Sequence, residues 1–309
     1  MKQGFVKVAS ATPGIRVADP VYNARAICIQ AKEAAEHGAK IIVFPELCIT
    51  GYTCNDLFLQ NLLLKKAKEA LLTIAEETSR FGALLFVGLP VEKDGRLYNV
   101  AAAVYRGSIL GMIPKKNIPT YAEFYEGRYF TSGEERITNF RLGEYEVPFG
   151  TNLLFCCEEL PELVLGCEIC EDLWVADPPS TSHALAGATV IANLSASNET
   201  VSKDAYRELL VKSTSARLLC GYIYTSAGEG ESTQDLVFGG HNLIAENGTL
   251  LAQSSRFATG ILYTDLDVLK ISSERRRMGT FGKQPTASYC KIPFSMELTE
   301  TRLERKLSL

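Results

Sequence analysis

The sequence is poor in histidine, with only three among 309 residues. His37 lies at the end of a predicted helix, His183 within another helix, and His241 in a predicted hairpin strand. None of them lies in a sequence motif that is typical of a catalytic histidine, so the sequence gives little support for a cysteine–histidine pair of the protease type. A cysteine nucleophile in this chain would need another base.

Long apolar runs and an excess of positive charge are also missing. No run approaches the roughly 20 residues that cross a bilayer. Residues 1–10 show no signal-peptide core or cleavage site. The 32 lysines and arginines are outnumbered by 36 acidic residues, for a net charge of −4, and so nothing indicates a nucleic-acid surface. We therefore expect a cytoplasmic protein with neither a membrane nor a nucleic acid as partner.

The nine cysteines are odd in number and have no framework spacing. In a reducing compartment most of them should be small buried residues. Cys167 and Cys170 have the spacing of a redox pair or half a metal site, but no second pair stands at zinc-site spacing. Cysteines three apart on a strand also face opposite sides. We rank a binding or redox module well below an enzyme, and predict that Cys167 packs inside a strand.

Helical and strand patterns alternate, which is typical of an α/β protein. A single domain is the simplest interpretation. The chain ends in a polar tail that is helix-like over 298–309. The basic run 275–277 is assigned by default to a solvated surface. The strands are expected at 4–10, 41–44, 84–90, 96–105, 108–113, 163–166, 190–194, 222–226, 237–245, 249–253 and 261–266, and the helices at 20–37, 57–81, 182–187 and 204–219.

Two segments repeat one pattern of helix, Gly-Ala, buried strand and polar exit. The first strand, 41–44, leads to Glu46, and the second, 190–194, leads to Ser197. The repeat is short and degenerate. It suggests a pair of sheets with approximate internal symmetry.

Three reactive side chains follow predicted buried strands: Glu46, Lys115 and Cys170. Ligands in α/β sheets bind beyond the carboxyl ends of strands. A thiol with a pKa near ~8.5 needs a base or a cation to react well at neutral pH. Glu46 could accept its proton, while Lys115 and the backbone N–H of Glu171 could stabilise an oxyanion. Taken singly, Glu46 and the Lys115–Lys116 pair would more often be surface charges.

These positions carry a family resemblance. Residues 44–47, 51–52, 114–115 and 169–172 resemble the motifs of the carbon–nitrogen hydrolase, or nitrilase, superfamily. Further motifs resemble one branch of it, the glutamine-hydrolysing domains of NAD synthetases; they lie at 118–121, 123–126, 170–174, 193–197 and 227–233. Each motif alone is weak, whereas all of them in order are specific.

The resemblance implies a four-layer α-β-β-α sandwich over residues 1–270. It makes Glu46 the general base, Lys115 the oxyanion stabiliser and Cys170 the nucleophile, and Glu126 the acid that positions the lysine and a water molecule. Lys115 is chosen over Lys116 because the motif places its lysine three residues before Ile118. The positions that match the substrate pocket are Tyr121, Glu171, Trp174, Ser197, Tyr52 and Lys203. Lys203 stands where relatives carry an arginine, and lacks the fork that grips a carboxylate.

The same resemblance implies glutamine as substrate and no metal or cofactor for its hydrolysis. ATP and Mg would serve only a synthetase domain, whose Ser-Gly-Gly…Asp-Ser loop this sequence lacks. Residues 271–309 would then be an extension or linker toward that domain, in the same polypeptide or a separate subunit, and we expect a homo-oligomer. The alternatives are a stand-alone amidase or carbamoylase acting on another small amide, and a scaffold with a dead site.

Overall fold

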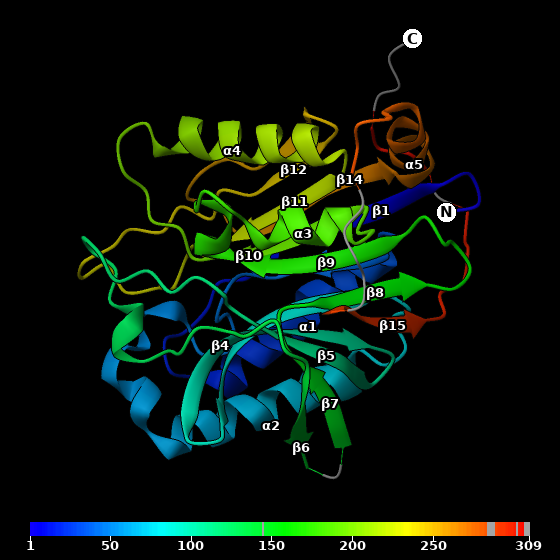
Figure 1. Cartoon of the computed structure of the whole chain (residues 1–309). Helices are drawn as coiled ribbons and strands as arrows, with labels where there is room; N and C mark the ends of the chain where they lie inside the picture. Colours follow the sequence, from blue (N-terminus) through cyan, green and yellow to red (C-terminus); the bar gives the residue numbers. More distant parts are fainter. Residues whose placement is uncertain (144, 283–287, 301, 306–309) are drawn as a thin grey trace.

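Two β-sheets face each other and helices cover both outer faces (Figure 1). The computed structural model describes residues 1–143, 145–282, 288–300 and 302–305. Apolar side chains form three main layers: one under α1 (Pro20–Glu36) and α2 (Asn61–Glu77), one between the sheets, and one under α3 (Pro179–Leu185) and α4 (Lys203–Leu218). The predicted α-β-β-α sandwich is confirmed.

The first sheet has eight strands in the described part of the chain. The strands of this first sheet lie in the order β14 (Gly260–Asp267), β1 (Phe5–Thr12), β2 (Ile41–Val43), β3 (Leu84–Lys93), β4 (Arg96–Tyr105), β5 (Ser108–Pro114), β7 (Tyr145–Phe149) and β6 (Thr138–Leu142). β1, β2 and β3 are parallel neighbours, while β3, β4 and β5 form an antiparallel meander.

The second sheet runs through β13 (Thr249–Gln253), β12 (Leu243–Glu246), β11 (Gly221–Ser226), β10 (Val190–Ser195), β9 (Val164–Ile169), β8 (Leu153–Cys157) and β15 (Cys290–Phe294). Its central strands β9, β10 and β11 are parallel. They therefore end at the same edge, as β1, β2 and β3 do in the first sheet, and strand exits from both sheets can meet there.

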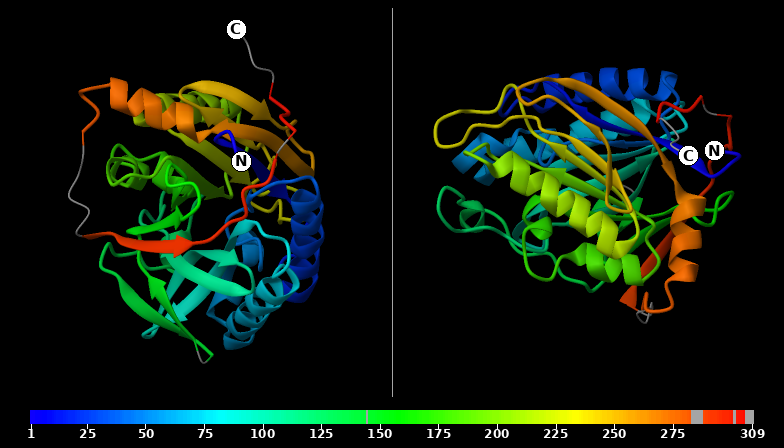
Figure 2. Two further views of the ribbon diagram at one scale, coloured as in Figure 1. Left: turned by 90° about the vertical axis from the view of Figure 1, so that its right-hand side faces the viewer. Right: turned by 90° about the horizontal axis from the view of Figure 1, so that it is seen from above.

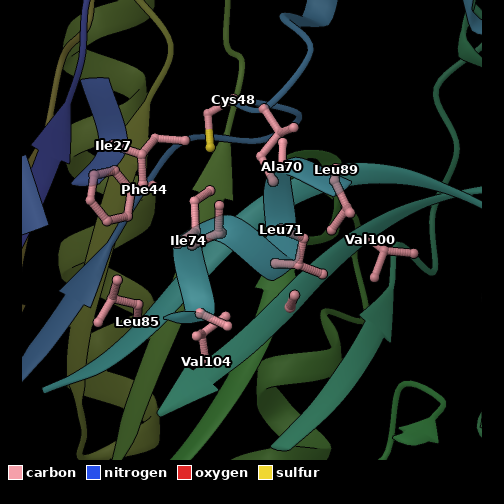
Figure 3. Packing of buried hydrophobic residues seen from close by; sticks show 14 of the residues in the cluster. Ile27, Phe44, Cys48, Ala70, Leu71, Ile74, Leu85, Leu89, Val100 and Val104 are labelled. Carbon is pink, nitrogen blue, oxygen red and sulfur yellow. The ribbon is translucent and has the colours of Figure 1, made fainter. Parts of the chain in front are cut away.

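Helices α1 and α2 hold the first sheet from outside through an apolar stripe (Figure 3). The carboxylate of Asp19 accepts the N–H of Tyr22 at 3.1 Å and so caps α1, a position at which aspartate is preferred. In α2, Leu71 and Ile74 recur at helical spacing and are fully buried. Burying a side chain of this size contributes about 1.5–3 kcal/mol.

The helix predicted over 57–81 starts later than expected. Residues Tyr52–Leu59 form a kinked 3₁₀ segment, η1, and the α-helix begins at Asn61. Asn55 has a φ of 49° inside this segment, which an α-helix does not accept, and Gln60 is extended. The tighter turns place Tyr52 beside the acidic cluster described below.

Two other predictions need correction. The strand expected over 237–245 is regular only in β12, because Gly240 has a φ of 59° and Phe238 makes an isolated bridge to Asn198 instead. The three strands β6, β7 and β8 fall in a stretch for which no element was expected. Short strands without strong alternation are easily missed from one sequence.

The tail predicted as helix-like over 298–309 is not helical at 298–300 or 302–305, and residues 301 and 306–309 lie outside the described residues. Its contacts include two ion pairs: Glu304 accepts from Lys7 at 3.0 Å, and Arg305 pairs with Glu246 at 2.7 Å. Among the described residues, no helix has the length and apolar character of a membrane span.

The boundary predicted after residue 270 falls inside α5 (Val268–Arg277). Beyond it, β15 pairs in parallel with β8 along the edge of the second sheet, and α5 packs on the body of the domain (Figure 2). The described part of 271–309 is thus built into the fold. Whether it also leads toward another domain stays a prediction.

Arg275 is not part of a solvated surface, contrary to the default interpretation of the 275–277 run. Its guanidinium donates to the carbonyls of Ala188 at 2.7 Å and of Leu218 and Leu219 at 2.9 Å. The last two acceptors are carbonyls at the end of α4, which a helix leaves without partners. Arg275 therefore ties α5 to the helical layer.

We expect Arg275→Met to lower the free energy of unfolding by about 2–3 kcal/mol, because it leaves buried carbonyls unpaired. Denaturant unfolding measures this. The exposed neighbour gives the matched control: Arg276→Met should change the free energy by less than about 0.5 kcal/mol. Equal effects of the two substitutions would contradict the assigned role.

Candidate active site

Strand exits from both sheets meet at one point. Glu46 follows β2 in the first sheet and touches the exit of β10 in the second: its N–H donates to the Ser195 carbonyl at 3.3 Å. In return, the N–H of Ala196 donates to Glu46 Oε2 at 2.8 Å. These are the exits of the two repeated segments found in the sequence, and they hold the carboxylate in place.

Lys115 lies between two carboxylates. Its Nζ donates to Oε1 of Glu46 and to Oε1 of Glu126, both at 2.6 Å. The lysine side chain has no exposed surface, and both acids are buried. Lys116 instead pairs with Glu135 at 2.8 Å near the surface. Lys115, and not Lys116, is therefore the lysine that lies in the buried cluster.

The charges in this cluster shift one another's pKa. Burial by itself lowers the pKa of Lys115, but Glu126 and Glu46 outweigh it, and the pKa ends well above its usual value. Burial raises the pKa of Glu126 to about 7, since the opposing effect of Lys115 is only partial and Glu46 adds repulsion. Lys115 is therefore a fixed cation, while Glu126 changes charge near neutral pH.

Cys170 stands on a sharp turn where β9 passes into the 3₁₀ segment η3 (Cys170–Leu173). Its φ of 46° is rare for a residue other than glycine and marks a strained elbow that presents a side chain. Cys170 is buried, with 6% of its surface exposed. Burial and the charge of Glu46 raise the pKa of Cys170, against the effect of Lys115. At rest the group is a neutral thiol, which needs a base to react.

The three histidines do not supply that base. His183 contacts the Cys167 carbonyl at 3.2 Å, from outside the second sheet, and burial lowers its pKa to about 4. His241 meets Arg207 at 2.8 Å, and His37 pairs with Glu304. Cys167 is buried among apolar residues between the sheets, as predicted.

Tyr52 joins the acidic cluster through its hydroxyl, which donates to Glu126 Oε1 at 2.9 Å. The segment that carries it is anchored by Glu231, whose carboxylate accepts the N–H groups of Tyr52 and Thr53 at 2.7 and 3.0 Å. A cavity of about 50 Å³ reaches both Tyr52 and Glu126. A water molecule needs about 10–15 Å³, so this cavity can hold several beside Glu126.

Tyr121 and Glu171 pair at the mouth of the site. The Tyr121 hydroxyl donates to Glu171 Oε1 at 2.8 Å, and the tyrosine is 55% exposed. Burial raises the pKa of Glu171. A carboxylate with one oxygen in this pair could still bind an ammonium group.

Lys203 lies over two aromatic rings, with its Nζ 5.1 Å from the centre of Trp174 and 5.4 Å from that of Phe124. It also contacts Asn198. Burial lowers the pKa of Lys203, and a thiolate at Cys170 would oppose that effect. Ser197 is buried nearby and accepts from Arg207 at 3.3 Å. The structure thus brings all ten predicted site residues to one region.

Sequence reasoning missed two residues of this site. Asn99 on β4 donates its amide to Glu46 at 2.6 Å and to Glu126 at 3.5 Å. Gly88 on β3 leaves room for the backbone before and after Glu46: a Cβ there would lie 2.3 Å from the Leu47 nitrogen. The sequence did contain indications of both residues. A polar residue inside an apolar strand needs a hydrogen-bond partner, and a glycine there often marks a close approach of another backbone.

Comparison with known proteins agrees with this geometry. The model of the carbon–nitrogen hydrolase family matches residues 7–276. The chain belongs to the carbon–nitrogen hydrolase family. It is 43% identical over 304 residues to a glutamine-dependent NAD(+) synthetase of Mycobacterium tuberculosis. The aligned region covers 96% of this chain and 45% of that relative. The chain therefore spans about half the length of that relative.

Solved structures of the family resemble it too. A glutamine-dependent NAD(+) synthetase from Cytophaga hutchinsonii has a TM-score of 0.76 and 30% identity, over 84% of this chain and 43% of that one. An amidase from Nesterenkonia has a TM-score of 0.67 and 21% identity, over 90% of this chain and 97% of that one. At this identity the second likeness concerns the fold alone.

We expect catalysis by this carbon–nitrogen hydrolase to fall as the pH drops through about 7. Below the pKa of Glu126 this acid is protonated, so Lys115 loses one carboxylate and pairs with Glu46 alone. The pH profile of kcat/KM reports such a group in the free enzyme. In Glu126→Gln the fall of kcat/KM near pH 7 should disappear, and kcat/KM should be lower than in the wild type but independent of pH in this range. If the fall near pH 7 is unchanged in Glu126→Gln, another group causes it.

Proposed function

We propose that this chain hydrolyses glutamine to glutamate and ammonia through a cysteine thioester. The observation that carries the proposal is the buried Glu46–Lys115–Glu126 cluster beside the strained elbow of Cys170. The relatives named above, which are glutamine-dependent synthetases, favour glutamine over other amides.

In the first half-reaction, Glu46 takes the proton of the Cys170 thiol as the sulfur attacks the side-chain carbonyl carbon of glutamine. The negative charge on the oxygen is stabilised by Lys115 and by the backbone N–H of Glu171. The tetrahedral intermediate collapses, the C–N bond breaks, and ammonia leaves with the proton that Glu46 held. A thioester remains on Cys170.

In the second half-reaction, water replaces ammonia. Glu46 takes a proton from a water molecule that Glu126 helps to position, and the resulting oxygen attacks the thioester. The C–S bond then breaks, glutamate is released, and the proton returns to sulfur. Every proton in this cycle is carried by residues of this chain, so we expect the hydrolysis to need no metal or cofactor.

The far end of glutamine carries an ammonium and a carboxylate. We assign the ammonium to Glu171, supported by Tyr121, and the carboxylate to Lys203, with Ser197, Trp174 and Tyr52 completing the walls. The cation of Lys203 is held by aromatic faces and Asn198. It gives one point charge where an arginine would give a bidentate grip.

We further propose that the ammonia serves a synthetase domain that amidates nicotinate adenine dinucleotide with ATP and Mg. Because the chain spans about half of its relatives, that domain would lie elsewhere in the same polypeptide or in a separate subunit. The cytoplasmic location and the homo-oligomeric state stay predictions.

Replacing the nucleophile tests the function. We expect Cys170→Ala to abolish ammonia release from glutamine, a loss of at least about 10³-fold, because no other group can form the thioester. The matched control is Cys167→Ala, which removes a sulfur from the same strand but leaves the elbow and should keep turnover near the wild-type rate.

The assay should include other small amides and carbamoyl compounds at equal concentration. Wild-type rates in Cys170→Ala would refute the mechanism. Hydrolysis of another amide with none of glutamine would support the amidase alternative instead.

A further inference from the structure

Asp172, two residues after Cys170, is buried and accepts four hydrogen bonds, all from N–H groups. Its Oδ1 accepts from the backbone N and the side-chain Nδ2 of Asn117, both at 2.8 Å. Its Oδ2 accepts from the backbone N of Ile169 at 3.0 Å and of Lys116 at 3.5 Å. Asp172 is 2% exposed, and its donors Lys116 and Asn117 are partly buried.

These donors flank the two reactive residues from opposite sheets. Ile169 ends β9 and directly precedes Cys170, while Lys116 and Asn117 directly follow Lys115 at the end of β5. β9 belongs to the second sheet and β5 to the first. One carboxylate thus clamps the cysteine elbow of one sheet to the lysine strand end of the other.

We propose that Asp172 is a positioning residue, which fixes the orientation of the Cys170 thiol relative to the Lys115 ammonium by clamping their two strand ends together. The inference rests on the proposed roles of these two residues. Asp172 does not act on the substrate itself. It holds the strained turn at Cys170 through the Ile169 N–H, and the lysine segment through Asn117.

The partners explain why an aspartate stands here. An ionised carboxylate has only acceptors, and its hydrogen bonds are stronger than those of a neutral group. An asparagine of the same size would turn an NH₂ toward N–H donors, and so would lose at least one side of the clamp. A purely structural residue would change stability, whereas a positioning residue should change kcat with little effect on KM.

The test compares Asp172→Asn with Asp177→Asn, an exposed aspartate in the same segment, using the whole chain. A displacement of about 1 Å between reacting groups costs about 100-fold in rate. We therefore expect a kcat for glutamine about 100-fold lower in Asp172→Asn, and unchanged in Asp177→Asn. KM should stay within about threefold, because the pocket is untouched.

Alkylation of Cys170 by iodoacetamide gives a second readout, independent of glutamine. It should slow in Asp172→Asn and not in Asp177→Asn. Asn117→Ala removes one of the four hydrogen bonds and should show a smaller fall of the same kind. Should Asp172→Asn fail to fold, Asn117→Ala decides the question by the same two measurements.

Wild-type kcat and labelling rate in a folded Asp172→Asn would overturn the inference, as would a loss confined to KM or to the melting temperature. Failure of the wild type to hydrolyse glutamine would refute the proposed function alone. The labelling rates would then still judge the clamp, since slower labelling supports it and equal labelling refutes it.

Discussion

The site depends on one buried cation held between two buried carboxylates. Lys115 has no exposed surface and contacts Glu46 and Glu126 at equal distances. Removing one partner of a buried ion pair costs about 3–5 kcal/mol, because the other charge stays buried and unpaired. The three charges also leave one net negative charge, which further donors must stabilise.

Those donors come from different elements of the fold. The amide of Asn99 comes from β4, the N–H of Ala196 from the exit of β10, and the hydroxyl of Tyr52 from η1. The close approach at Gly88 lets the Glu46 turn lie on the first sheet. Asn99 and Tyr52 belong to the first half of the chain and Ala196 follows a strand of the second sheet, so the cluster requires both halves of the chain.

The arrangement also explains how a buried thiol can react. Burial keeps Cys170 neutral, so the proton must leave as the bond to carbon forms, toward a carboxylate already fixed by Lys115 and Ala196. The cation that fixes this base is also the one proposed to receive the oxyanion. Preorganised charges of this kind cost no rearrangement at the moment of reaction.

Sequence reasoning anticipated the parts that local patterns encode. The alternation of helices and strands gave the fold class, and the strand exits at Glu46, Lys115 and Cys170 predicted a common site. It could not anticipate contacts between segments that are distant in sequence, such as those of Asn99, Asp172 and Arg275, because such side chains share no local pattern. It also misplaced the start of α2, because the extended backbone of Gln60 interrupts the helical pattern expected from residue 57.

The most direct test of the account is to label the protein with a glutamine analogue that carries an electrophilic carbon in place of the amide, and to map the adduct by peptide mass spectrometry. The account predicts a single adduct, on Cys170, whose formation is slowed by excess glutamine. An adduct on Cys167 or another cysteine, with Cys170 unmodified, would contradict it.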